Sequence, residues 1–106
     1  MSYRFILCER RDNADRVAMA NTALAICKEV KKSEGIDSAK FYWSGPDKIA
    51  FLIEGEPRIL NGGVGAANPV EMGKLLFNLS DLARQTMDII LGDPRLGAQA
   101  YQNAGR

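Results

Sequence analysis

The sequence predicts one α+β domain in which an antiparallel sheet is covered by helices on one face. The chain has 106 residues, which suits a single hydrophobic core. Its apolar residues recur with two periods, one typical of strands and one typical of helices. These segments follow the order strand, helix, strand, strand, helix, and a right-handed crossover would put the first helix on one face of the sheet.

The first strand and the first helix are expected between residues 3 and 34. Residues 3–9 (YRFILCE) are rich in aromatic and branched side chains and end in charge, which predicts a strand. Asp12 or Asn13 can cap a helix running from about residue 13 to residue 34. Gly35 supplies the left-handed residue that commonly ends a helix. The helical apolar stripe contains Val17, Met19, Ala20, Ala23, Leu24, Ile26, Cys27 and Val30.

A β-hairpin is the clearest local pattern in the chain. Residues 38–44 and 48–54 predict two strands, and Gly45-Pro46-Asp47 between them favours a turn. A tight turn would pair Tyr42 with Phe51. One face of the hairpin would then carry Phe41, Trp43, Ala50 and Leu52, and the other Tyr42, Ile49, Phe51 and Ile53.

The second half of the chain predicts a loop followed by a long helix. Residues 54–67 are loop-like, with residues 58–60 as a short edge strand. Asn68-Pro69 gives a capped helix start, and helical spacing continues to Gly92. We therefore expect a domain core over residues 3–91, a tail over residues 92–106, and no fourth strand of normal length.

The predicted sheet is apolar on both faces. The first strand places Phe5 and Leu7 on one side and Ile6 and Cys8 on the other. Two helices cover only one face, whereas a sheet with one wet face alternates apolar with polar residues. We therefore expect a homodimer in which two sheets face each other. The alternative is a monomer whose C-terminal tail folds back over the open face.

This order of elements, with aromatic strands and a dimer-forming sheet, resembles the dimeric α+β barrel branch of the ferredoxin-like folds. The resemblance covers roughly residues 3–91 and rests on no diagnostic motif. Members normally have a fourth strand after the second helix. At this position the present chain has Gly92-Asp93-Pro94 and a polar tail. The group includes small monooxygenases, haem-degrading enzymes, isomerases and stress-response proteins. The resemblance thus implies a fold and a dimer, and fold alone does not choose the activity.

Composition excludes several classes of function. The net charge is +1 with no basic stripe, so neither a nucleic acid nor an anionic membrane is an expected partner. The N-terminal apolar run is too short for a signal peptide, which predicts a cytoplasmic protein. Because the chain has no histidine, Ser-His and Cys-His pairs and most zinc sites are excluded. The resembling haem-degrading enzymes usually present a histidine to the iron, so that activity is not expected, and we expect no metal and no cofactor. Cys8 and Cys27 are predicted to be reduced core thiols.

Candidate site residues lie mainly near the predicted strand ends. A carboxylate base beside a guanidinium clamp would suit proton abstraction from a small acidic substrate. The catalytic candidates are Glu54, Tyr42 and Arg58, and the ligand-binding candidates are Trp43, Glu9 and Arg10. Solvated ion pairs and aromatic packing are the alternatives. The glycines at 62–65 before a helix start could hold an anion or serve as a flexible connector.

Two functions remain open from the sequence. The first hypothesis is a non-catalytic or small-ligand-binding module, with an apolar cavity between sheet and helices that takes a small apolar or aromatic ligand. The alternative is a cofactor-independent enzyme, monooxygenase-like or isomerase-like, that acts on a small aromatic or carbonyl compound. The two differ in whether polar groups converge on the pocket.

Overall fold

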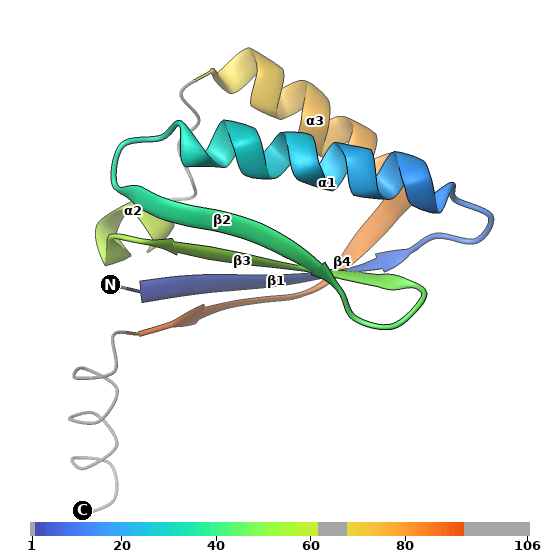
Figure 1. Cartoon of the computed structure of the whole chain (residues 1–106), viewed down its shortest axis with the longest axis horizontal. Coiled ribbons are helices and arrows are strands. Elements are labelled where there is room, and N and C mark those ends of the chain that lie inside the picture. Colours follow the sequence, from blue (N-terminus) through green and yellow to red (C-terminus); the bar gives the residue numbers. More distant parts are fainter. Residues whose placement is uncertain (1, 62–67, 93–106) are drawn as a thin grey trace, which may run out of the picture.

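The computed structural model describes residues 2–61 and 68–92 and shows a ferredoxin-like α+β fold, which confirms the predicted fold class. The four strands form one sheet with the order β2-β3-β1-β4, and all neighbours are antiparallel. Helices α1 and α3 lie on one face of this sheet, and α2 lies at the end where β1 begins (Figure 1). The elements are β1 (Ser2–Arg10), α1 (Arg16–Lys31), β2 (Ile36–Trp43), β3 (Lys48–Gly55), α2 (Pro57–Asn61), α3 (Pro69–Leu82) and β4 (Ala83–Leu91).

The fourth strand corrects the prediction of one helix up to residue 91. Helix α3 ends at Leu82, and Ala83 already has extended backbone angles of φ −150° and ψ 158°. Met87 and Ile90 are three residues apart, which fits a helix, but Met87, Ile89 and Leu91 also alternate as in a strand. Pairing with β1 favours the strand over the helix because it gives this segment a ladder of backbone hydrogen bonds, with one register shift between Leu7 and Cys8.

The limits of α1 also differ from the prediction of residues 13–34. Asp15 is the N-cap, and its side chain accepts a hydrogen bond from the backbone N–H of Val17 at 2.9 Å. Asn13, one of the two expected caps, instead adopts a left-handed φ of 63° in the connection before the helix. The helix ends at Lys31, and the left-handed Gly35 (φ 87°) lies in the turn that leads into β2.

The predicted edge strand at residues 58–60 is wrong, because these residues lie in the short helix α2. Pro57 opens this helix, a position where the missing N–H of proline leaves no hydrogen bond unmade. Leu60 is completely buried and joins the hydrophobic core. Helix α2 therefore closes the end of the sheet where β1 begins.

The hairpin register is one residue away from the predicted one. Phe41, and not Tyr42, lies opposite Phe51, and Tyr42 lies opposite Ala50. The turn is wider than expected, since Ser44 N–H donates to the carbonyl of Lys48 at 2.8 Å across residues 45–47. A slip of one residue exchanges the two faces of a strand. Phe41 and Trp43 therefore face the helices, and Tyr42 faces the other side.

The core lies between the helix layer and the sheet. It consists of Cys8, Met19, Ala23, Ile26, Cys27, Val30, Ile49, Phe51, Ile53, Leu60, Met72, Leu79 and Ala83. Both cysteines are buried and unpaired, which confirms the prediction of core thiols. Burial raises the pKa of each thiol to about 11.

The opposite side of the sheet, which we call the open face, carries no described helix (Figure 1). Strand alternation and pairing place on it Tyr3, Phe5, Leu7, Tyr42, Ala50, Leu52, Met87, Ile89 and Leu91. Tyr42 is 53% exposed, and Met87, Ile89 and Leu91 are 43–45% exposed. The sheet thus carries large apolar side chains on both faces, with Lys40 and Glu54 also on the open face. Among the described residues, no helix is long and apolar enough to cross a membrane.

Candidate functional site

A charged pair lies on the helix-facing side of the sheet. Arg4 alternates along β1 with Ile6 and Cys8, both of which belong to the core or pack against it. Asp88 on β4 lies opposite Ile6 in the ladder. Arg4 Nε donates to Asp88 Oδ1 at 2.9 Å and Nη2 to Oδ2 at 2.6 Å. A bidentate ion pair thus links the first strand to the last one on an otherwise apolar wall.

The two charges stabilise each other in this position. The side chains of Arg4 and Asp88 are 21% and 27% exposed, so the pair is partly desolvated and still accessible from solvent. The hydrogen bond from Arg4 lowers the pKa of Asp88, and the same bond raises the pKa of Arg4. Both groups are therefore ionised at neutral pH. Arg4 Nη1 also donates to the carbonyl of Leu60 in α2 at 3.4 Å.

Neither Arg4 nor Asp88 is among the site residues predicted from the sequence. A signal for Arg4 was present, because a guanidinium at a position that alternates with Ile6 and Cys8 must face the apolar side of the strand. Asp88 gave no comparable signal, since its segment was assigned to a helix. The pair joins residues 84 positions apart and needs the fourth strand.

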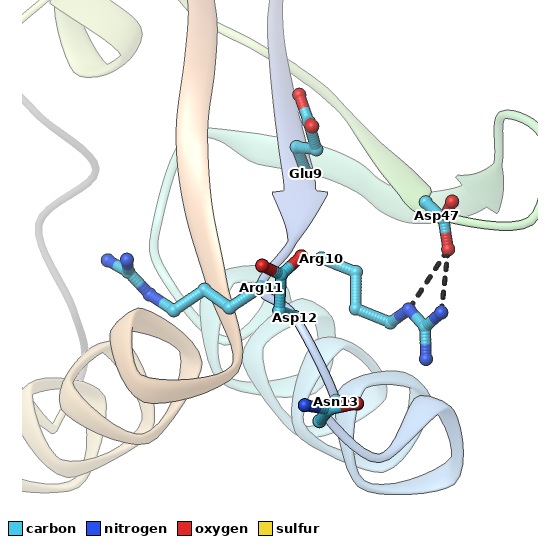
Figure 2. A pocket seen from close by; sticks show the side chains of 6 residues that line it. All are labelled: Glu9, Arg10, Arg11, Asp12, Asn13 and Asp47. Carbon is cyan, nitrogen blue, oxygen red and sulfur yellow. Dashed lines mark hydrogen bonds and ion pairs between the residues drawn. The ribbon is translucent and has the colours of Figure 1, made fainter.

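A second feature is a polar pocket at the end of the sheet where β1 ends. Its volume is about 430 Å³, and it is lined by Glu9, Arg10, Arg11, Asp12, Asn13 and Asp47 (Figure 2). Arg10 binds Asp47 Oδ1 through Nε at 3.0 Å and Nη2 at 2.8 Å, and the carbonyl of Ala14 through Nη1 at 2.9 Å. Arg11 points away from Asp47, and its Nε donates to the carbonyl of Ser80 at 2.8 Å. Both arginines thus join segments of the fold.

The three predicted ligand-binding residues are divided between two places. Glu9 and Arg10 line this pocket, and Glu9 lies 3.6 Å from Arg84 of β4. Trp43 is not among the residues that line it. Its ring lies on the helix-facing side of β2 under the guanidinium of Arg16, 4.6 Å from the ring centroid.

The three predicted catalytic residues are not brought together. Glu54 is half-buried on β3, where Ser38 Oγ lies 3.5 Å from Oε1, and its hydrogen bond with Tyr3 raises the pKa of that phenol. Tyr42 of β2 pairs with Ala50 of β3. Ala50 is four residues from Glu54 along β3, a distance of roughly 13 Å. Arg58 lies in α2 and binds Glu56 at 3.2 Å.

Two further expectations concern the start of α3 and metal binding. Asn68 Oδ1 accepts from the backbone N–H of Glu71 at 3.2 Å, which confirms the predicted cap. The glycines at 62–65 lie outside the described residues, so the anion site stays a prediction. Within residues 2–61 and 68–92, no group of three or more cysteine, aspartate or glutamate side chains is placed to hold a metal ion.

Solved structures share this arrangement over most of their length. Rv0793 from Mycobacterium tuberculosis has a TM-score of 0.70 at 16% identity, over 87% of this chain and 93% of that one. An antibiotic biosynthesis monooxygenase has a TM-score of 0.70 at 11% identity, over 88% and 98%. SnoaB, a cofactor-independent oxygenase from Streptomyces nogalater, has a TM-score of 0.67 at 7% identity, over 87% and 92%.

The chain has the fold of the antibiotic biosynthesis monooxygenases. This confirms the architectural resemblance to the dimeric α+β barrel group, including the fourth strand that its members have. At 7–16% identity the similarity establishes the fold and leaves the activity open. No protein-family model and no curated protein matches the sequence.

Proposed function

We propose that this protein is a cofactor-independent enzyme that acts on a small aromatic or carbonyl compound, with oxygenase chemistry as the reaction type. This is the alternative of the two hypotheses drawn from the sequence. SnoaB, which shares the fold, is described as a cofactor-independent oxygenase. A purely ligand-binding module would also account for the fold, and the two functions differ in whether the bound compound reacts with O₂.

The observation that carries the proposal is the Arg4–Asp88 ion pair. A partly buried pair of this kind is seldom better for stability than two well-packed apolar side chains. Its accessible guanidinium, on the face that packs under the helices, gives an apolar wall one charged and directional group. An apolar surface with a few placed polar groups is the usual composition of a small-molecule site.

The electron balance restricts the substrate. When no cofactor supplies electrons, the substrate must provide all four electrons that reduce O₂ to one inserted oxygen and one water. An activated CH₂ group satisfies this requirement: the carbon loses two hydrogens and gains one oxygen as C=O, and the second oxygen leaves as water. A CH₂ group next to carbonyl or phenolic groups gives up its protons readily, which suits a small aromatic or carbonyl compound.

Oxygen uptake tests this function. We expect the protein, without added flavin, haem or metal, to consume O₂ with a member of a panel of hydroxylated aromatic ketones. Arg4→Gln should lower the rate roughly 100-fold, the usual effect of removing a group that stabilises developing charge. Lys28→Gln is the control, because it also removes one positive charge, from an exposed position on α1. Ligand binding without O₂ uptake would favour the binding module, and equal losses in both variants would reject Arg4.

We further propose that two copies pair through their open faces and that the enzyme is cytoplasmic. The open face holds large, half-exposed apolar side chains that no described helix covers. Burial of apolar surface is worth about 25 cal/mol per Å², so pairing of two such faces is strongly favourable. The two helix layers would lie outside, and each Arg4–Asp88 pair would lie within its own subunit.

A further inference from the structure

We propose that Arg4 binds an ionised oxygen of the substrate, a phenolate or an enolate, and that Asp88 is the residue that positions the guanidinium for this contact. The inference rests on the proposed function and specifies the substrate group that the site recognises. Its basis is the bidentate Arg4–Asp88 geometry on an apolar, solvent-accessible wall.

The guanidinium keeps donors available for a ligand. An arginine side chain has five N–H donors in a fixed plane. Asp88 takes the hydrogen on Nε and one hydrogen on Nη2, and the carbonyl of Leu60 takes one hydrogen on Nη1 at 3.4 Å. These bonds leave one N–H on each terminal nitrogen. Two such donors suit one oxyanion, and charge-assisted hydrogen bonds of this type are shorter and stronger than neutral ones.

The side chains around Arg4 favour a ligand whose remaining part is apolar. In the sheet, Arg4 lies opposite Ile53 on β3 and Ile90 on β4, and Ile6 follows it on the same face. Ile90 is 42% exposed, so the wall beside the guanidinium is apolar and open to contact. The chemistry that fits is therefore a hydrocarbon body with a single negative oxygen. A multiply charged group such as a phosphate fits poorly, because the carboxylate of Asp88 already neutralises the guanidinium.

Asp88 acts through Arg4 in this arrangement. Both of its oxygens accept hydrogen bonds from the guanidinium, and the resulting fall in its pKa makes the carboxylate a weak base. Asp88 therefore fixes the plane of the guanidinium and takes no proton from the substrate. The phenol or enol releases its proton to water, and the ionised form is favoured because it accepts hydrogen bonds from the remaining N–H groups of Arg4.

Titration of a bound chromogenic phenol tests the inference. The probe is 4-nitrophenol, whose phenolate absorbs in the visible range, and 4-nitrotoluene is its neutral counterpart. In the unaltered protein we expect the pKa of bound 4-nitrophenol to fall below that of the free compound. Arg4→Gln should abolish this shift and weaken phenolate binding roughly ten-fold or more, while 4-nitrotoluene binds as before. Lys28→Gln should change neither.

The Asp88→Ala variant distinguishes a positioning role of Asp88 from a purely electrostatic effect of its charge. Removal of a negative charge next to Arg4 should tighten phenolate binding if electrostatics alone mattered. Loss of the positioning contact should instead weaken it several-fold, with 4-nitrotoluene affinity retained as evidence of an intact fold. Tighter binding in Asp88→Ala would overturn the role of Asp88. A probe pKa that is equal in the unaltered protein and in Arg4→Gln would overturn the role of Arg4.

The outcomes distinguish this inference from the proposed function. If O₂ uptake depends on Arg4 but the probe pKa does not, the enzyme proposal stands and the oxyanion contact is wrong. If the probe pKa depends on Arg4 but no substrate consumes O₂, the contact stands and the oxygenase proposal is wrong. Equal affinity of the unaltered protein for phenolate and for 4-nitrotoluene rejects the inference outright.

Discussion

The carbonyl oxygen of Gly35 lies 2.7 Å from the point that a Cβ on Gly55 would occupy, and Cδ1 of Ile36 lies 2.9 Å from it. The end of β3 thus passes directly against the turn that leads from α1 into β2. Because one of these neighbours is backbone, the chain has to shift to admit a methyl group.

Gly55→Ala should therefore destabilise the protein by about 1–3 kcal/mol, the usual effect of overpacking. Gly73→Ala is the matched control, since nothing lies within 4 Å of its added Cβ in the exposed part of α3. That change should raise the free energy of unfolding by about 1 kcal/mol through helix propensity. Urea denaturation of both variants measures the contrast, and a Gly55→Ala variant as stable as the unaltered protein would contradict the packing.

The two buried thiols should react slowly in the folded protein. Burial raises the pKa of Cys8 and Cys27 from 9.0 to about 11, which reduces the thiolate fraction at pH 8 roughly 100-fold. We expect labelling by a thiol-disulfide reagent to be at least that much faster in 8 M urea, where both side chains are exposed. Equal rates with and without urea would show that the core opens freely.

The Arg4–Asp88 pair should make stability depend on pH. The pKa of Asp88 is below 3.8 in the folded state because of its hydrogen bond with Arg4, so its contribution is complete above pH 3.8. The contribution is lost as the pH falls through the lower, folded-state pKa. Asp88→Asn should therefore be less stable than the unaltered protein at pH 6, and the difference should shrink below pH 3.8. Asp37→Asn, an exposed change of equal charge on β2, is the control.

A substitution on the open face should disrupt the proposed dimer. Ile89 is 43% exposed there, and Ile89→Lys would place an ammonium group in the interface, so we expect a shift from dimer to monomer. Val17→Lys is the control, because Val17 is 67% exposed on α1, which lies on the other side of the sheet. Sedimentation velocity measures both. A monomeric unaltered protein at micromolar concentration would contradict the pairing.

Local chemistry was sufficient to predict several elements. Asn68 and Pro69 set the start of α3, because a capping side chain and a proline act within one turn of the helix. The branched and aromatic residues from Tyr3 to Cys8 predicted β1 for the same local reason. Neither element depends on contacts with a distant part of the chain.

The elements that were missed depend on such contacts. Strand β4 forms because β1 is available beside it, and nothing within residues 83–91 shows that. The hairpin register follows from the shape of the turn around Gly45, where the φ of 79° lies in the left-handed region. The candidate site was missed because β4 was missed, since Arg4 and Asp88 meet only when that strand is in place.

The position of β1 between β3 and β4 has a consequence for synthesis on the ribosome. This strand is translated before both of its neighbours, since β3 begins at residue 48 and β4 only at residue 83. A growing chain can form α1 early, but β1 has no partner until β3 is made, and its other edge stays unpaired until residues 83–91 follow. Any product that stops after α3 would carry a bare strand edge, the kind of surface that recruits wrong partners.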